Sequence, residues 1–278
     1  MIKILYGTAW KEDDTERLVR LALETGFRGI DTACQPKHYN EAGVGAGIAA
    51  SLTARLHRAQ LYLQSKFTPL SGHEPQRPPY DAGASPAAQV EQSCALSLQN
   101  LRTDYLDCLL LHSPLPTAEE SLEVWQAMER LVDSGRVRQL GISNCVRLTQ
   151  LEALCQQARI QPAVLQNRFH ADTGYDQKLR DFCRPRGIVY QSFWTLTANP
   201  HLLVHNSVRT LARRYGRTPA QILFRYLTQI GIVPLTGTRS VAHMRQDLAI
   251  FDFTLEPAEC EAMAAILQPG LDRRRSSR

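Results

Sequence analysis

Four polar side chains stand at or just beyond the ends of short apolar runs. Asp31 ends the run in FRGIDTA, Lys66 lies near the end of LYLQSKF, and His112 follows LDCLLL. Tyr39 comes shortly after Asp31, in KHYNE. In a parallel β/α fold the carboxyl ends of the strands carry the chemistry, so we expect these four residues to form one proton-transfer site.

The four side-chain types suit the reduction of a carbonyl group. A free phenol has a pKa of about 10 and is a poor acid at neutral pH, but an ammonium such as Lys66 favours phenolate and lowers that pKa. Asp31 would keep Lys66 charged and oriented. Tyr39 would then give a proton to the carbonyl oxygen, and His112 would be a second donor to that oxygen. A bound nicotinamide would deliver the hydride.

Each of these residues also has a simpler interpretation. Asp31 could cap a helix, and Lys66 could be a surface lysine whose stem covers apolar surface. Tyr39 could be an ordinary exposed tyrosine, and His112 could cap the end of its strand. Four different polar types at the ends of three successive apolar runs favour the catalytic interpretation.

Short apolar runs alternate along the chain with longer amphipathic stretches. The runs end near residues 9, 31, 66, 112, 141, 167, 191 and 235. The helix-like stretches cover 13–26, 41–57, 85–101, 117–135, 146–159, 175–185, 217–231 and roughly 241–249. Thr117 with Glu120, and Thr218 before Pro219, are typical helix starts.

This alternation predicts an α/β protein with a (β/α)8 TIM barrel. A doubly wound open sheet is the alternative, but the turn after the first run contains no GxGxxG. We expect a single catalytic domain over residues 1–268, followed by a basic and flexible tail over 269–278. The proline-rich segment 68–84 would be a long loop on the active face.

The charge of the chain gives no sign of a nucleic-acid partner. The net charge is +5, and four of the arginines lie in the terminal DRRRSSR; without them 28 basic and 27 acidic residues remain. No long apolar run or secretory signal is present, so we expect no membrane association and a cytoplasmic location. We expect a monomer or a homodimer.

The cysteines and other possible ligands do not suggest a metal centre. The seven cysteines are scattered and include no CxxC pair, which argues against a disulfide framework and a cysteine-based zinc site. No other metal-ligand spacing is present, and we expect no metal.

The sequence resembles a known family, the aldo-keto reductases, from about residue 4 to residue 266. The matching stretches, in order, are GFRGIDTA with YNEAGVG, LQSKF, SLQNLRTDYLDCLLLHSP, VRQLGISN, AVLQNRF, GIVYQSF, TPAQILFRY, and IVPLTGTR followed by DLAIFDF. The resemblance implies a (β/α)8 barrel that reduces a small carbonyl compound, with NADPH preferred and NADH not excluded. It assigns the catalytic roles to Asp31, Tyr39, Lys66 and His112.

The resemblance also implies a set of cofactor contacts. Ser143, Asn144 and Gln166 would hydrogen-bond the nicotinamide carboxamide, whose donors and acceptor they match. Tyr190 would stack under the nicotinamide ring. The adenosine phosphate would lie at the turn after the eighth strand, which holds Gly237, Thr238 and Arg239.

These cofactor residues have structural alternatives. Ser143 and Asn144 could cap the helix that starts near residue 146, and Tyr190 could be a core tyrosine. Arg239 could be a surface arginine in a turn.

Several features depart from the family pattern. Asp31 and Tyr39 are eight positions apart, farther than in most members, and the inserted CQPKH must bulge if the phenol is to reach Lys66. The usual lysine and serine after the eighth-strand proline are replaced by Leu235 and Thr236. We expect an open substrate pocket, with His112 at its base and with Trp10, Trp194 and the 68–84 loop as walls.

Two other functions stay open at this stage. A Schiff-base aldolase would use Lys66 as its nucleophile and would need no nicotinamide. A dinucleotide-binding barrel could instead serve as a non-catalytic sensor or scaffold, if the lengthened loop before Tyr39 spoils catalysis.

Overall fold

Eight parallel strands close into a barrel in chain order, as the alternating pattern predicts. The computed structural model describes residues 2–267, so the predicted flexible tail over 269–278 lies outside the described residues. The strands are β1 (Leu5–Gly7), β2 (Gly29–Asp31), β3 (Tyr62–Phe67), β4 (Cys108–Leu111), β5 (Leu140–Ser143), β6 (Val164–Arg168), β7 (Val189–Phe193) and β8 (Val233–Thr236). β1 pairs with both β2 and β8, which closes the ring.

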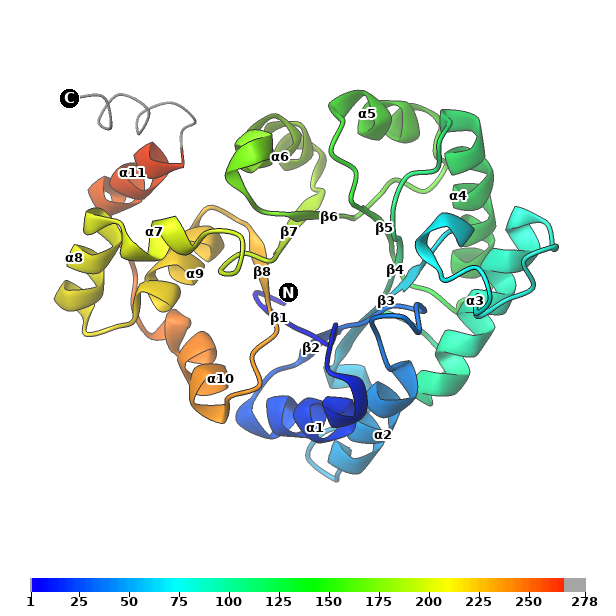
Figure 1. Ribbon diagram of the computed structural model, residues 1–278, viewed down its shortest axis with the longest axis horizontal. Coiled ribbons are helices and arrows are strands. Elements are labelled where there is room, and N and C mark those ends of the chain that lie inside the picture. The colour runs from blue at the N-terminus through cyan, green and yellow to red at the C-terminus, as the bar shows by residue number, and fades with distance from the viewer. Residues whose placement is uncertain (1, 268–278) are drawn as a thin grey trace.

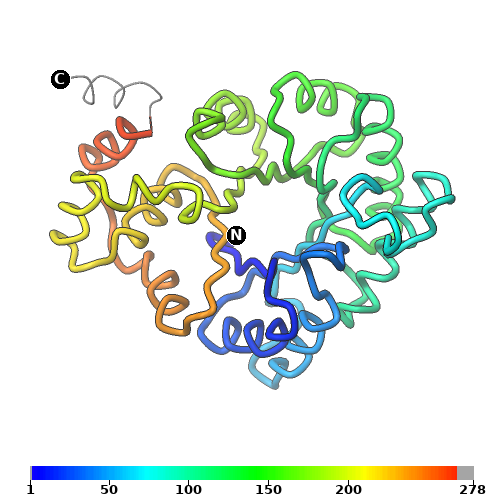
Figure 2. The backbone as a smooth tube through the Cα atoms, viewed as in Figure 1, coloured from blue at the N-terminus to red at the C-terminus, as the bar shows by residue number. Residues whose placement is uncertain are grey.

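The helices form an outer ring around the strands (Figures 1 and 2). They are α1 (Thr15–Thr25), α2 (Glu41–Ser51), α3 (Pro86–Leu101), α4 (Ala118–Asp133), α5 (Leu148–Gln157), α6 (Gln177–Cys183), α7 (Pro200–Val204), α8 (Asn206–Tyr215), α9 (Pro219–Gln229), α10 (Val241–Leu248) and α11 (Pro257–Ile266). Short 3-10 helices cover Glu12–Asp14, Arg58–Gln60, Leu70–Gly72, Ala171–Asp176, Arg184–Arg186 and Ala249–Asp252. Within residues 2–267 no helix has the length and hydropathy that a membrane span requires.

Two of the helix starts follow the capping signals in the sequence. Before α4, Glu120 N donates to Thr117 Oγ1 at 3.1 Å and Thr117 N donates to Glu120 Oε2 at 3.0 Å. Thr218 and Gln221 form the same reciprocal pair before α9, and Pro219 is the first residue of that helix. Each pair satisfies backbone donors that a helix start leaves without partners.

The helix predicted over 41–57 is shorter than expected. It ends at Ser51 because Leu52 has an extended backbone and Thr53 pairs with Leu56 in an isolated bridge. The helices α7, α8 and α11 were not predicted. In α8 the buried residues Val208, Leu211 and Ala212 have helical spacing, which is a signal that the sequence did contain.

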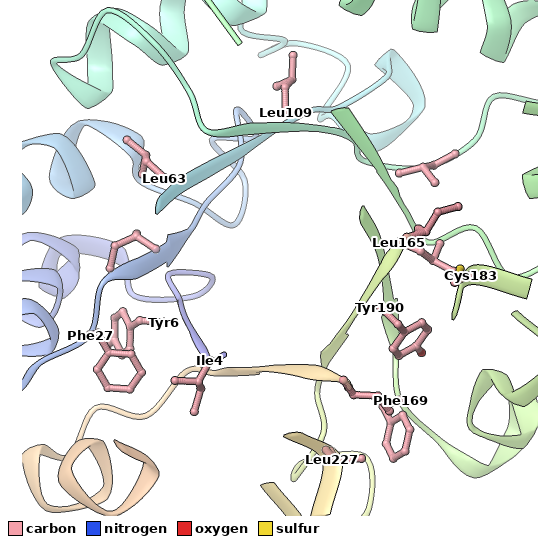
Figure 3. Packing of buried hydrophobic residues seen from close by; sticks show 14 of the residues in the cluster. Ile4, Tyr6, Phe27, Leu63, Leu109, Leu165, Phe169, Cys183, Tyr190 and Leu227 are labelled. Atoms are coloured by element: carbon pink, nitrogen blue, oxygen red, sulfur yellow. The ribbon is translucent and has the colours of Figure 1, made fainter. Parts of the chain in front are cut away.

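Strand side chains alternate between the helix layer and the barrel interior. Figure 3 shows Leu63, Leu109, Leu165 and Tyr190 outside the ring of strands, where the helices cover them. Gln64, Gln166 and Gln191 directly follow three of these residues and so point into the ring. Hydrogen bonds between Gln64 of β3 and Gln191 of β7 cross its interior. The barrel interior near the carboxyl ends of the strands is therefore polar, and the candidate catalytic groups lie there.

We predict that Gly45→Ala destabilises the fold through the contact between α2 and α3. A Cβ at Gly45 would lie 2.0 Å from the Asn100 carbonyl oxygen and 2.8 Å from the Leu101 Cα. Overpacking of this kind costs about 1–3 kcal/mol, which urea unfolding would measure. Gly83→Ala is the matched control, since its nearest neighbour would be 3.5 Å away. Equal free energies of unfolding for both variants would contradict the packing shown here.

Candidate active site

The four predicted catalytic side chains meet at the carboxyl end of the barrel. Asp31 ends β2, Lys66 is the next-to-last residue of β3, and His112 directly follows β4. Tyr39 comes from the loop before α2. Lys66 Nζ donates to Asp31 Oδ2 at 2.7 Å and to the Thr32 carbonyl at 2.8 Å. Only 1% of the Lys66 side chain and 3% of the Asp31 side chain are exposed, so this is a buried ion pair.

The aromatic ring of Tyr39 lies over this pair. Lys66 Nζ is 5.2 Å from the centre of the Tyr39 ring. The Tyr39 and His112 rings meet edge to face, with centroids 6.1 Å apart and planes inclined by 69°. An ammonium, a phenol and an imidazole therefore border one small volume.

Burial and charge set the protonation states of these groups. Burial raises the pKa of the Tyr39 phenol, and the Lys66 charge opposes that rise only in part. Lys66 therefore acts on the Tyr39 pKa in the expected direction, but desolvation outweighs the ammonium and the pKa of Tyr39 is raised overall.

The other two groups shift in opposite directions. Burial acts to lower the pKa of Lys66, but the Asp31 charge leads the interactions that outweigh it, and the Lys66 pKa is raised. Burial, together with the Lys66 charge, holds the pKa of His112 well below its usual range. At neutral pH the site contains a protonated phenol, an ammonium and a neutral imidazole.

The long loop before Tyr39 keeps the phenol in reach of Lys66. The backbone of Cys34 pairs with that of Phe67, at the end of β3, in an isolated parallel β-bridge, and this pairing fixes the start of the loop. Gln35 Nε2 donates to the Gly72 carbonyl at 2.7 Å, and Tyr39 N donates to the Gln35 carbonyl at 3.0 Å. The inserted residues therefore form a turn that returns the chain to the site.

The loop over 68–84 supports the site from behind instead of forming a wall. Thr68 Oγ1 lies 2.7 Å from His112 Nδ1 and so orients the imidazole. The Tyr80 hydroxyl donates to the Thr68 carbonyl at 2.7 Å, which holds Thr68 in place. Residues 69–84 do not line the active-site cavity of the described chain. The expectation that this loop forms a wall of the pocket is therefore wrong.

Two glutamines complete the hydrogen bonding of Asp31, and a third glutamine links them. Gln64 Nε2 and Gln166 Nε2 donate to Asp31 Oδ1 at 2.7 and 2.9 Å. Both amides also donate to Gln191 Oε1 at 2.9 Å. The sequence analysis did not identify Gln64 and Gln191. The alternation of side chains along β3 and β7, which turns both glutamines inward, could have identified them.

A buried carboxyl group joins the Tyr39 segment to the Lys66 strand. Ser65 Oγ donates to Glu41 Oε1 at 2.5 Å, and Ser97 Oγ lies 3.0 Å from both carboxyl oxygens. Burial raises the pKa of Glu41. Because Glu41 is two residues after Tyr39 and Ser65 is one before Lys66, this contact fixes the spacing of the acid and the ammonium. The sequence analysis did not identify it.

The residues predicted to bind the nicotinamide amide lie together on the next strands. Ser143 Oγ donates to the Gln166 carbonyl at 2.8 Å, and Asn144 Nδ2 donates to the His112 carbonyl at 2.8 Å. All three predicted residues line the cavity. The alternative that Ser143 and Asn144 cap α5 does not hold, because its N-cap is Arg147.

Tyr190 does not line the cavity of the described chain, so the prediction that it stacks under the nicotinamide ring is wrong. Its side chain is 4% exposed and lies outside the ring of strands (Figure 3). Its hydroxyl donates to Asp176 Oδ2 at 2.9 Å. Strand alternation turns the next residue, Gln191, towards the interior. The core-tyrosine alternative is therefore the correct one.

The turn after β8 is bound to the loop after β1. Gly237, Thr238 and Arg239 all line the cavity, as predicted. Arg239 NH2 donates to the Trp10 carbonyl at 2.6 Å, and Arg239 NH1 lies 3.8 Å from the Asp14 carboxylate. The arginine is thus already partnered by the neighbouring loop.

Lys11 is a second cation at this end of the cavity, and the sequence analysis missed it. Its Nζ donates to the Gly237 carbonyl. Burial and the nearby Arg239 charge lower the pKa of Lys11 to about 8. Two cations therefore border the part of the cavity next to β8.

One cavity of about 940 Å³ connects these regions. It extends from Tyr39 and His112 to the turn after β8, and Trp10 and Trp194 line it. The two tryptophans are 52% and 46% exposed, and both have a left-handed backbone, with φ of 59° and 55°. Bulky residues rarely adopt this conformation, and it concentrates at functional sites.

Comparison with known proteins identifies the family of this chain. The sequence model of the aldo/keto reductase family matches residues 3–268. An aldo-keto reductase of Mycolicibacterium paratuberculosis is 33% identical over 256 residues, which cover 92% of this chain and 82% of that protein. The glyoxal reductase of Bacillus subtilis is 31% identical over 249 residues, covering 89% of this chain and 82% of the relative.

Solved structures give the same result. An aldo-keto reductase from a Medee basin deep-sea metagenome library superposes with a TM-score of 0.83 and 26% identity, covering 97% of this chain and 92% of that chain. An aldo/keto reductase from Brucella melitensis gives a TM-score of 0.80 and 28% identity, covering 95% and 94%. The relatives support an oxidoreductase that acts on carbonyl groups, and the chain belongs to the aldo/keto reductase family.

Proposed function

We propose that this protein reduces an aldehyde or ketone to an alcohol with a hydride from NADPH, and that Tyr39 is the general acid. One observation carries the proposal. The Tyr39 phenol and the His112 imidazole line one end of a cavity of about 940 Å³, and the buried Lys66 ammonium lies 5.2 Å from the centre of the Tyr39 ring.

The chemistry at the carbonyl follows from these protonation states. The substrate oxygen lies between the Tyr39 hydroxyl and the His112 ring, which both donate to it. As the carbonyl carbon gains the hydride, Tyr39 gives its proton to the oxygen, so the product is a neutral alcohol. The Lys66 charge stabilises the phenolate that remains, and Asp31 holds Lys66 in position. Solvent then returns a proton to Tyr39.

The residues near β5 and β6 fit a nicotinamide carboxamide. A bound nicotinamide dinucleotide supplies the hydride. Gln166 Nε2 is engaged by Asp31 and Gln191, but within residues 2–267 its Oε1 accepts no hydrogen bond, so it can accept from an amide N–H. The Ser143 hydroxyl and the Asn144 side chain lie beside it and line the same cavity.

The two cations near β8 support a phosphate-binding end. Arg239 and Lys11 now donate to backbone carbonyls, and a phosphate would offer each a stronger, charged acceptor. Arg239 is the more exposed of the two, and we assign it to the 2′-phosphate that distinguishes NADPH from NADH.

The two rival functions fit the site less well. A Schiff-base lysine must be able to lose its proton, whereas Lys66 is buried against Asp31 and its pKa is raised. A non-catalytic scaffold would follow if the long loop displaced Tyr39, but Tyr39 lies over Lys66. Both facts favour the reductase.

We predict that Tyr39→Phe lowers kcat for aldehyde reduction by about 100- to 10,000-fold, because it removes the general acid. Binding of NADPH, measured by fluorescence titration, stays close to that of the wild type. Tyr105→Phe, which removes a hydroxyl that forms no hydrogen bond within the described chain, is the matched control. Full activity of Tyr39→Phe would refute the assigned role.

We predict a flat pH profile for reduction from about pH 6 to pH 9, because Tyr39 keeps its proton and His112 stays neutral in this range. Since the Tyr39 pKa is raised, kcat/KM falls only when the pH rises towards and above the ordinary value for tyrosine. The measurement is kcat/KM for one aldehyde at saturating NADPH. A decline centred between pH 6 and pH 8 would contradict it.

We predict that Arg239→Gln raises the KM for NADPH by about 10- to 100-fold, the usual worth of hydrogen bonds to a charged group. The KM for NADH changes much less, because NADH lacks the 2′-phosphate. Arg217→Gln is the control, since Arg217 also lies near a carboxylate, 3.9 Å from Asp252. Equal effects on both cofactors would assign Arg239 to another part of the dinucleotide.

A further inference from the structure

Arg168 places a positive charge at the mouth of the cavity that the proposed mechanism does not use. It is the last residue of β6, two positions after Gln166, so both side chains leave the same face of the strand. Arg168 is exposed and lines the cavity. Its position was not among the sites identified from the sequence.

The charge of Arg168 has no partner of opposite sign. Throughout the described chain, residues 2–267, its side chain forms no ion pair and no hydrogen bond. It lies against an aromatic ring instead: the guanidinium carbon is 4.2 Å from the centre of the Trp194 ring. The arginine at the other end of the cavity differs in this respect, because Arg239 is held by the Trp10 carbonyl.

Trp194 keeps the guanidinium at the cavity. Its backbone has φ 55°, a conformation that the surrounding chain must hold in place. Ala198 N donates to the Trp194 carbonyl at 2.8 Å, and Phe169 N donates to the carbonyl of Phe193 at 3.1 Å. A guanidinium stacked on an indole keeps its N–H groups free in the ring plane, where an anion can approach.

The electrostatics of the cavity favour an anion near Arg168. The acidic residues of the lining are Asp31, which Lys66 neutralises, and Asp247. Asp247 lies on α10 and accepts from Thr236 Oγ1 at 2.7 Å. His112, which follows β4, is neutral because its pKa is held well below the usual range. Along the wall from β2 to β6, the described lining residues therefore include no unpaired carboxylate that would oppose an anion, since Asp247 lies beyond β8.

We propose that Arg168 and Trp194 form a subsite for an anionic group of the substrate, so the enzyme prefers aldehydes or ketones that carry a carboxylate. This inference rests on the proposed carbonyl reduction. β4 and β6 are two strand spacings apart, or about 10 Å. The carboxylate is therefore separated from the carbonyl by a planar or extended spacer, as in an aromatic aldehyde acid, and a 2-oxo acid is too short.

The test compares two aldehydes that differ in charge: 4-carboxybenzaldehyde and its neutral methyl ester. For each, kcat/KM is measured at saturating NADPH with wild type, Arg168→Gln and Arg186→Gln. Arg186 is the matched control, since its guanidinium stacks on Phe182 at 3.7 Å outside this cavity.

We expect the wild type to prefer the carboxylate, with a preference that shrinks as ionic strength rises. Arg168→Gln lowers the ratio of kcat/KM for the acid to that for the ester by about 10- to 100-fold, while Arg186→Gln leaves it unchanged. The dissociation constant of NADPH, measured by fluorescence titration, is the same for Arg168→Gln and wild type.

Two results would overturn the subsite. The first is a wild type that turns over both aldehydes with no preference. The second is an Arg168→Gln variant that slows both equally and weakens NADPH binding, which would assign Arg168 to the diphosphate of the cofactor. A wild type that reduces neither aldehyde nor any neutral carbonyl would instead refute the carbonyl reduction itself.

Discussion

The buried ion pair between Lys66 and Asp31 constrains everything around it. Breaking such a pair costs about 3–5 kcal/mol because one charge is left buried alone, so each remaining lone pair and proton needs a partner. The Thr32 carbonyl accepts a hydrogen bond from the Lys66 ammonium, and Gln64 and Gln166 donate to the second carboxylate oxygen of Asp31. The buried ion pair and the polar interior of the barrel are thus one hydrogen-bonded unit that spans several strands.

The site combines this rigid part with a part that depends on loops. Asp31 and Lys66 are strand residues, but Tyr39 is not, and its distance from Lys66 is set by contacts outside the barrel interior. Glu41 binds Ser65 behind the site, and Gln35 fixes the turn that carries the inserted residues. An insertion before Tyr39 is tolerated because these contacts hold both of its ends.

The sequence was most informative where a polar residue interrupts an apolar run. The barrel and the positions of Asp31, Lys66 and His112 followed from that pattern, since strand ends are local features. Tyr190 was misplaced because the alternation of the strand was not applied to it, and a shift by one residue exchanges inside for outside. Lys11 was not identifiable in this way, because its partner Gly237 is brought near it only when the barrel closes.

If the dinucleotide binds as proposed, the hydrogen bonds between the first and the last β/α loops affect the thermodynamics of its binding. Lys11 and Arg239 donate to the carbonyls of Gly237 and Trp10. A phosphate that uses these cations replaces existing hydrogen bonds, so the enthalpy gained is the difference between two sets of contacts. Departure of the dinucleotide restores the first set. Under that proposal, these hydrogen bonds at the closure between β1 and β8 lower the affinity for the cofactor and so favour its release.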